Sequence, residues 1–140
     1  MACDLKFSSI NINGMNDLSK QRKLVNHIKV KKLDVIYLQE HNLRNKSLLS
    51  IELLNLCDVH INLAINQKGG TAILINKRIG HEILSCEMSA DSRIISLRVK
   101  YYENILQFVN VYAPASVSHS ERDLFFRKNC FIILEIILIM

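Results

Sequence analysis

The feature that most constrains the fold is the apolar core of residues 33–39, a short segment without glycine or proline. By periodicity alone such a segment could be a strand or part of a buried helix, but its length favours a strand that is buried on both faces. It follows residues 17–30, an amphipathic stretch in which Asp17 or Ser19 can cap a helix. Residues 5–12 form an earlier candidate strand that ends in a turn signal. These three segments predict a β-α-β unit with parallel strands.

The remainder of the chain predicts antiparallel pairing. Short stretches with strand-like composition or alternation recur at residues 60–65, 71–75, 81–88, 93–101 and 105–112. Gly69-Gly70 is interpreted as the turn of a hairpin, because it lacks the strand-loop-helix context of a phosphate-binding loop. Residues 48–56 predict a short helix, and Ser120 with Asp123 resembles a capping box that opens a second helix. The expected fold class is α/β (α+β), with layered sheets and helices.

Alternation in the last two candidate strands places polar side chains at a strand end. Residues 93–101 present one apolar face, which is expected to lie on the core. In residues 105–112 the side chains of Phe108, Asn110 and Tyr112 point the same way. Pro114 then ends the strand. Asn110 and Tyr112 are therefore predicted to share one face at the carboxyl end of this strand.

Composition limits the class of protein. The chain has 140 residues, 49% of them hydrophobic, with one proline and four glycines, which indicates one globular domain without a linker or repeats. Its four cysteines form no C-x-x-C pair, so neither a zinc site nor a disulfide framework is indicated, and a reducing intracellular setting is expected. Asp4 and Lys6 interrupt any signal sequence, and no apolar run approaches the roughly 20 residues that span a bilayer. We expect a protein that is neither secreted nor in a membrane.

The net charge of +5 makes a polyanionic partner plausible, because lysine and arginine near phosphates release bound counterions. Part of the excess lies in residues 20–32. A solvated face of a surface helix is the favoured interpretation of this cluster.

Four short strings stand at the ends of predicted elements: Ser9-Ile10-Asn11-Ile12-Asn13-Gly14, Leu38-Gln39-Glu40, Gly70-Thr71-Ala72-Ile73-Leu74 and Asn110-Val111-Tyr112-Ala113-Pro114. In this order they resemble the endonuclease/exonuclease/phosphatase superfamily, and in particular the nuclease domain of non-LTR retrotransposons. The resemblance covers roughly residues 4–128. It implies a deoxyribonuclease-I-like, two-sheet β-sandwich flanked by helices. Residues 1–129 would be its N-terminal portion, and residues 130–140 an apolar tail.

The resemblance also implies a magnesium-dependent (or manganese-dependent) site that cleaves phosphodiester bonds in DNA, with no small-molecule cofactor. Glu40 would be the metal ligand, and Asn11 and Tyr112 would complete the catalytic set. Asn13, Arg93 and Asn110 would contact the substrate, and Asn13 stands where several relatives have aspartate. Oxygen ligands suit magnesium, for which one or two carboxylates are enough.

Local chemistry alone leaves simpler interpretations open for these residues. Glu40 could be an exposed loop carboxylate, Tyr112 an amphipathic tyrosine at a strand end, and Arg93 half of a surface ion pair. His41, next to Glu40, could serve as a general base, but an exposed loop histidine is the favoured interpretation.

Two strings expected in the second half of such a domain, Gly-Asp-x-Asn and an Asp-His pair, do not occur in this sequence. We therefore expect a truncated retroelement nuclease domain, weakly active or inactive alone and nuclear if it acts on DNA. The alternative is a non-catalytic basic remnant that binds nucleic acid or protein. An uncovered sheet face or the apolar tail could also mediate self-association.

Overall fold

The computed structural model describes residues 4–113 and 118–128. The elements in chain order are β1 (Phe7–Asn11), α1 (Leu18–Lys31), β2 (Val35–Gln39), the 3-10 helix η1 (Lys46–Leu48), α2 (Ile51–Leu56), β3 (Cys57–Asn62), β4 (Thr71–Asn76), β5 (Glu82–Met88), β6 (Ile94–Tyr101), β7 (Asn104–Val111) and α3 (His119–Lys128). The predicted strand stop at Pro114 and the apolar tail 130–140 lie outside the described residues.

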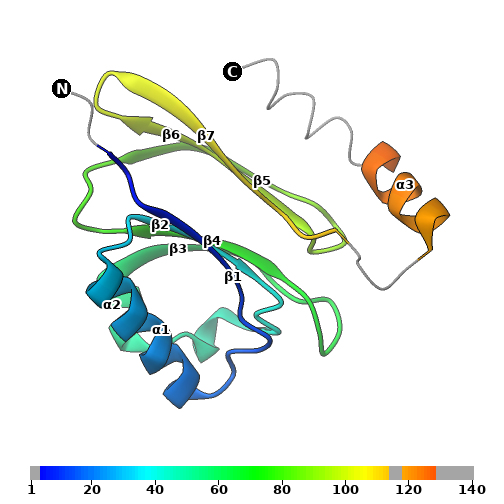
Figure 1. Ribbon diagram of the computed structural model, residues 1–140, viewed down its shortest axis with the longest axis horizontal. Helices are drawn as coiled ribbons and strands as arrows, with labels where there is room; N and C mark the ends of the chain where they lie inside the picture. The colour runs from blue at the N-terminus through cyan, green and yellow to red at the C-terminus, as the bar shows by residue number, and fades with distance from the viewer. Residues whose placement is uncertain (1–3, 114–117, 129–140) are drawn as a thin grey trace.

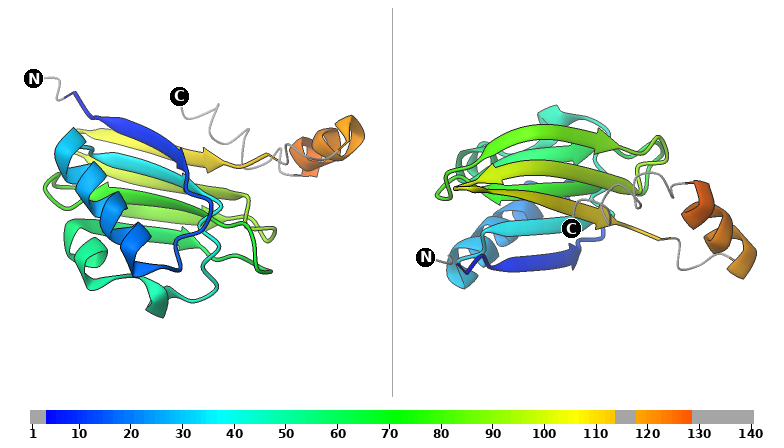
Figure 2. Two further views of the ribbon diagram at one scale, coloured as in Figure 1. Left: turned by 60° about the horizontal axis from the view of Figure 1, so that its bottom comes forward. Right: turned by 90° about the horizontal axis from the view of Figure 1, so that it is seen from above.

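The strands form two sheets. The first sheet has the order β1-β2-β4-β3, in which β1 and β2 are parallel and the other pairs antiparallel. The second sheet is an antiparallel meander, β5-β6-β7. Figure 1 shows the second sheet on one face of the first sheet, with α1 and α2 on the other face, and the views in Figure 2 agree. The predicted β-α-β unit and the antiparallel remainder are both present.

Burial on both faces explains the apolar segment in β2. Ile36 and Leu38 pack toward the helices, whereas Val35 lies in the cluster between the two sheets. In β4, next to β2, all six residues are buried, and Leu74 and Ile75 alternate between the same two clusters. Each fully buried aliphatic side chain contributes roughly 1.5–3 kcal/mol relative to exposure. The two central strands therefore hold the three layers together.

Helix α1 has clear local signals at both ends. Asp17 is the N-cap, and its side chain accepts a hydrogen bond from the backbone nitrogen of Ser19 at 2.9 Å. Of the two predicted caps, the structure uses Asp17. Lys32 ends the helix in the left-handed region, with φ 53°. Leu24, Val25 and Ile28 are buried against the first sheet.

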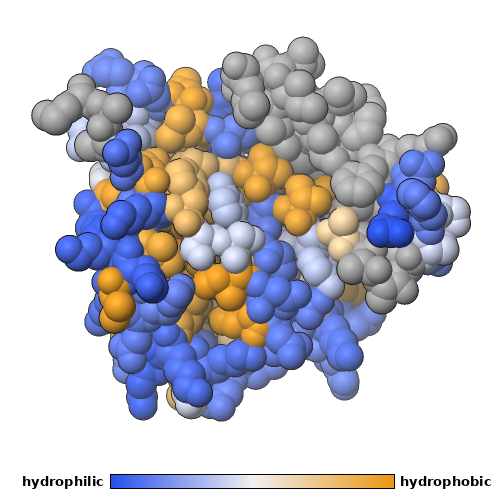
Figure 3. Space-filling model, viewed as in Figure 1, coloured by the Kyte–Doolittle hydropathy of each residue, from blue (hydrophilic) through white to orange (hydrophobic). Residues whose placement is uncertain are grey.

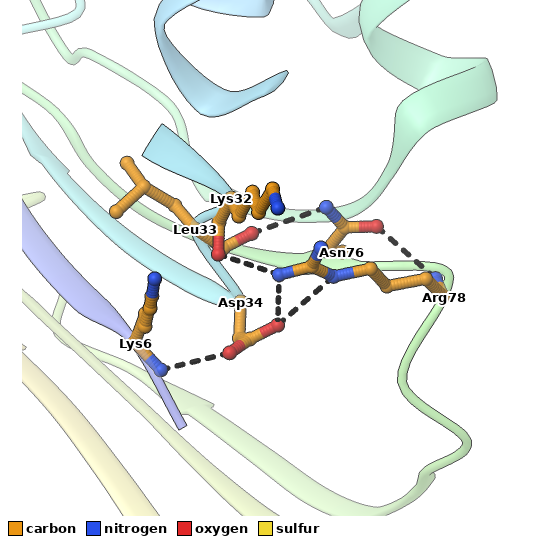
Figure 4. Close-up of polar contacts among 6 residues, drawn as sticks. All are labelled: Lys6, Lys32, Leu33, Asp34, Asn76 and Arg78. Carbon is orange, nitrogen blue, oxygen red and sulfur yellow. Dashed lines mark hydrogen bonds and ion pairs between the residues drawn. The ribbon is translucent and has the colours of Figure 1, made fainter. Parts of the chain in front are cut away.

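A polar network fastens the end of the first sheet at which β2 begins (Figure 4). Arg78 Nη2 lies 2.7 Å from Asp34 Oδ1, and the other carboxylate oxygen accepts from the backbone nitrogen of Lys6 at 2.8 Å. Asn76 donates to the carbonyl of Leu33 at 3.1 Å and accepts from the backbone nitrogen of Arg78. The network joins the start of β2 to the end of β4 and to the residue before β1.

Three local predictions differ from the structure. The single helix expected at residues 48–56 is a 3-10 turn followed by α2, and β3 begins at Cys57 instead of residue 60. The predicted capping box at Ser120 was wrong. Ser118 Oγ accepts from the backbone nitrogen of Glu121 at 3.3 Å, and the Glu121 carboxylate accepts from the backbone nitrogen of Ser118 at 3.1 Å.

The surface in Figure 3 carries hydrophobic residues in the middle of the face that Figure 1 views, with hydrophilic residues around them. Among the described residues, Phe7 of the edge strand β1 is 48% exposed, and Ile105 of the edge strand β7 is 49% exposed. None of the helices within residues 4–113 and 118–128 has the length and hydropathy to cross a bilayer.

Candidate active site

One end of both sheets surrounds a pocket of about 460 Å³. Its lining comes from the residues that follow β1, β2 and β7 and from those that precede β4 and β6: Asn13, Glu40, Asn42, Ile65, Asn66, Lys68, Gly69, Gly70, Asp91, Ser92, Arg93 and Tyr112. Four of the six predicted site residues, Asn13, Glu40, Arg93 and Tyr112, lie in this lining. Two carboxylates and two cationic side chains therefore share one concave surface.

The side chains of Glu40 and Tyr112 meet in this pocket. The Tyr112 hydroxyl donates a short hydrogen bond to Glu40 Oε1, across 72 residues of sequence. This bond is the main reason that the pKa of Tyr112 is raised, followed by burial and the negative charge of Glu40, while the Arg93 guanidinium acts in the opposite direction. The tyrosine is thus held as a neutral hydrogen-bond donor.

Arg93 supports Tyr112 from two directions. Its guanidinium carbon lies 5.7 Å from the centroid of the Tyr112 ring, and its backbone carbonyl accepts from the Tyr112 nitrogen at 2.8 Å. A turn with several internal hydrogen bonds positions Arg93. Asp91 Oδ1 accepts from Ser89 Oγ at 2.6 Å and from the Arg93 nitrogen at 3.2 Å. The Asn62 side chain donates to the carbonyls of Ser89 and Ile94, which anchors the turn to β3.

Glu40 stands on a strained turn. Its φ of 54° and the 60° of Asn42 are both in the left-handed region, which is uncommon for residues other than glycine and asparagine. Two backbone hydrogen bonds hold Glu40 from opposite sides. Its nitrogen donates to the carbonyl oxygen of Gly70 at 2.9 Å, and its carbonyl oxygen accepts from the nitrogen of Gly14 at 2.7 Å. Gly69 donates to the Asn42 side chain at 2.8 Å. The glycine pair is thus both a turn and a support for Glu40.

His41 is completely buried, so the interpretation as an exposed loop histidine was wrong. Its Nδ1 accepts from the backbone nitrogen of Leu43 at 2.9 Å, and its Nε2 lies 2.9 Å from the carbonyl oxygen of Asn62. Burial lowers the pKa of His41, with hydrogen bonding to the Asn62 backbone as a smaller opposing cause. The side chain points into the protein and does not line the pocket.

The two asparagines after β1 have different positions. Asn11 Oδ1 accepts from the backbone nitrogen of Asn13 at 3.2 Å, which forms a local turn and helps to hold Asn13 at φ 50°. Asn13 lines the pocket with Glu40. Asn11 is exposed and lies instead beside α1, in a groove that includes Lys20 and Lys23. The structure therefore brings Asn13, but not Asn11, to the pocket.

Asn110 is 3% exposed and links the two sheets beneath the pocket. Its amide nitrogen donates to the carbonyl of Leu38 at 2.8 Å and to that of Ala72 at 2.9 Å. Its amide oxygen accepts from the side chain of Gln39 at 2.8 Å. The predicted alternation of β7 is present, and it directs Asn110 inward while the next polar residue, Tyr112, reaches the pocket. Substrate contact by Asn110 stays a prediction.

The available ligands suit a hard cation. Glu40 and Asp91 supply carboxylate oxygens and Asn13 an amide oxygen, and the lining residues within 4–113 and 118–128 include no histidine or cysteine. Among the described residues, no group of three or more His, Cys, Asp or Glu side chains could hold a metal. Magnesium retains several waters and needs only one or two carboxylates, so this oxygen set fits magnesium better than zinc.

Sequence reasoning missed several pocket residues. Lys68, Asn66 and Asp91 lie outside the four motif strings, and only the three-dimensional arrangement brings them beside Glu40. Asn62 was also missed, because its role depends on carbonyl groups 27 and 32 residues away. The turn signal at Gly69-Gly70 marked one of the two loops without indicating that both loops reach one pocket.

The two sheets and their flanking helices form a layered α/β fold of the deoxyribonuclease-I-like type, as the sequence predicted. No protein-family model matches the chain.

Solved structures that share this arrangement include an AP endonuclease from Archaeoglobus fulgidus, with a TM-score of 0.68, 17% identity, and coverage of 87% of this chain and 46% of that chain. A D. rerio TDP2 complexed with single strand DNA product has a TM-score of 0.67, 17% identity, and coverage of 95% and 54%. A 3' phosphatase from Neisseria bound to a product DNA hairpin has a TM-score of 0.65, 17% identity, and coverage of 89% and 49%. The chain thus spans about half the length of these proteins.

Proposed function

We propose that this chain carries the metal-binding and phosphate-contacting part of a magnesium-dependent DNA phosphodiesterase. The observation that supports the proposal best is the contact between Glu40 and Tyr112 in a pocket that also holds Arg93. The carboxylate can hold a hard cation, while the neutral hydroxyl donor and the guanidinium can contact the negatively charged phosphodiester.

The pocket residues have separable roles in this proposal. Glu40 would hold the ion, with Asn13 or Asp91 as a further oxygen ligand. Bound magnesium would offset charge on the phosphoryl oxygens. The Tyr112 hydroxyl is protonated at neutral pH, and it would donate to a phosphate oxygen in place of Glu40 once the carboxylate holds the ion. Arg93 adds a fixed positive charge behind the tyrosine ring.

Two observations support DNA as the substrate. The net charge of +5 favours a polyanion, and the basic residues of α1, including Lys20 and Lys23, lie along a groove next to the residues that end β1. Two of the similar solved structures were determined with DNA, as their descriptions state. A phosphate-dominated contact of this kind would weaken steeply with salt.

We further propose that the domain derives from a non-LTR retroelement and would act in the nucleus. The four motif strings support this origin, including asparagine at position 13. The sequence contains neither a Gly-Asp-x-Asn string nor an Asp-His pair, and no histidine lines the pocket. We therefore expect activity by this chain alone to be weak, since catalytic groups that act as a unit do not contribute additively.

The lack of a histidine among the described pocket residues also supports the alternative, a non-catalytic domain that binds nucleic acid. A plasmid-nicking assay separates the two functions. Supercoiled plasmid is incubated with the chain and magnesium, with Glu40→Gln as the test variant and Glu52→Gln on α2 as the matched control. Glu52 is exposed and forms a long ion pair of 3.8 Å with Arg22, away from the pocket. Glu40→Gln preserves size and removes only the charge.

Nicking that requires magnesium, persists in Glu52→Gln and falls at least about tenfold in Glu40→Gln would support the phosphodiesterase. Salt-sensitive DNA binding without any nicking, unchanged in Glu40→Gln, would instead support the binding domain. Nicking that is equal in all three proteins would indicate a contaminating nuclease and overturn the proposed role of Glu40.

A further inference from the structure

His41 is buried directly beneath the turn that carries Glu40, and it does not line the pocket. It stands between two residues, Glu40 and Asn42, that both have left-handed backbone conformations. Such a turn is unfavourable for an L-residue, so surrounding contacts must determine it. Hydrogen bonds with Gly14 and Gly70 hold this turn on the pocket side, and the buried ring of His41 adds a contact from beneath, to the backbone nitrogen of Leu43.

The hydrogen bonds of His41 define its protonation state. A backbone N–H, that of Leu43, donates to Nδ1, so Nδ1 must carry a lone pair. The proton of the neutral ring is then on Nε2, which donates to the carbonyl of Asn62. Both ring nitrogens are therefore satisfied by backbone groups in a single tautomer, and the imidazole has one orientation in its site.

Asn62 connects this contact to the opposite wall of the pocket. Its carbonyl accepts from His41, while its side chain donates to the carbonyls of Ser89 and Ile94 on either side of Arg93. A continuous path runs from the Glu40 turn through the imidazole and Asn62 to the turn that presents Arg93. A histidine that only filled space in the core would not link the two walls.

Gly70 completes the arrangement. A Cβ added at Gly70 would overlap the imidazole ring, whereas a Cβ at Gly69 would meet no atom within 4 Å. The two glycines have similar backbone conformations, with φ of 93° and 104°. Gly70 thus leaves the space that His41 occupies, and Gly69 serves as its conformational control.

We propose that His41 is the positioning residue of the candidate metal site: it holds the Glu40 turn at a fixed place relative to Arg93. The effect on metal affinity that this inference predicts rests on the proposed function. The effect on the backbone conformation of Glu40 can be tested without metal or activity.

The structural test measures the backbone of Glu40 by NMR. Left-handed residues give a strong HN–Hα contact within the residue and a characteristic coupling constant. Wild type should show this signature at Glu40. His41→Leu should lose it while the dispersed spectrum of the folded sheets persists. His41→Asn should retain it in part, because its amide oxygen can still accept from Leu43. If His41→Leu is folded and keeps the Glu40 signature, the proposal is wrong.

The glycine pair provides a second route that leaves His41 unchanged. Gly70→Ala should displace the imidazole and alter the Glu40 signature, whereas Gly69→Ala, at a similarly positive φ, adds a Cβ that meets no atom within 4 Å and should preserve it. This comparison decides the question even if His41→Leu fails to fold. Equal spectra at Glu40 in the two alanine variants would overturn the proposal.

The metal test uses manganese as the probe, with its affinity measured by water proton relaxation. Wild type should bind manganese, and His41→Leu should bind it about 10–100-fold more weakly, with His41→Asn between them. Equal affinities in wild type and a folded His41→Leu would overturn the positioning role. If wild type and Glu40→Gln show the same negligible affinity, the proposed function fails, and the Glu40 backbone signal alone then decides the role of His41.

Discussion

The Tyr112 hydroxyl donates to the Glu40 carboxylate, so a residue beyond the end of β7 contacts a residue beyond the end of β2. The contact joins the two sheets at the rim of the candidate site. It makes the ionisation of one side chain depend on the other, which can be measured directly.

Glu40→Gln should lower the pKa of Tyr112 toward its ordinary value of 10.0, because the hydrogen bond to a carboxylate is the main cause that raises it. NMR titration of tyrosine labelled at Cζ reports the shift, with Tyr112→Phe identifying the signal. The folded pKa exceeds the unfolded one, so this contact adds stability below about pH 10 that is lost as the pH rises through the folded value. A Tyr112 signal that titrates identically in both proteins would show that the contact does not form.

Acid should destabilise the fold through the buried His41 and the half-buried His60. Burial lowers the pKa of both His41 and His60 from the ordinary 6.5, so unfolding takes up protons below that pH. The contribution of these two histidines to the free energy of unfolding is therefore fully present above pH 6.5, and it declines as the pH falls below that value. His41→Asn should flatten this decline in urea midpoints measured between about pH 7 and pH 5. The exposed His27→Asn is the control, and a wild-type slope in His41→Asn would contradict the prediction.

The pair Asp34–Arg78 should stabilise the first sheet more than a surface ion pair does. The Asp34 side chain is 8% exposed, and removal of Arg78 leaves its charge with the backbone nitrogen of Lys6 as its remaining identified partner. Arg78→Ala should cost about 2 kcal/mol in urea unfolding. Arg22→Ala, which removes an exposed pair, should cost under about 0.5 kcal/mol. A double-mutant cycle with Asp34→Ala should give a coupling of about 1 kcal/mol or more.

The N-terminus of α3 should depend on Ser118 and not on Ser120. Ser118→Ala removes the hydroxyl that accepts from the Glu121 nitrogen and should cost the helix about 1 kcal/mol. Ser120→Ala changes a residue within the first turn and should cost much less. Hydrogen exchange at the Glu121 amide measures the difference. Faster exchange in Ser120→Ala than in Ser118→Ala would contradict the cap at Ser118.

Much of the fold could be predicted because apolar residues form short runs or alternate with the two-residue period of a strand. The core of residues 33–39 is buried on both faces, and the alternation of residues 105–112 correctly brings Phe108 and Asn110 inward. The start of β3 at Cys57 was missed because Asp58 interrupts the apolar pattern before residue 60; the start comes from pairing with β4 and not from composition. The cap at Ser118 was missed because two serines two residues apart offer equivalent local patterns.

The candidate site could be predicted only in part. Motif strings placed Glu40, Asn13 and Tyr112 at strand ends, which is where the pocket lies. The burial of His41 depends on the carbonyl of Asn62 and the missing side chain of Gly70, and neither is visible in a local pattern. Asn11 and Asn13 stand in the same motif string, but only Asn13 lines the pocket, and the Asn11 side chain instead accepts from the backbone nitrogen of Asn13.

The amide of Asn110 that bridges the sheets has a consequence for the order of folding. Gln39 and Asn110 are 71 residues apart, and the ends of that long loop must meet before their contact can form. Loop closure of this length is entropically costly and slow compared with the hairpin of β6 and β7. The hairpin and the β-α-β unit can each form early, so the pocket should be among the last parts of the native state to assemble. A partly folded chain would then have most of its strands and no competent site.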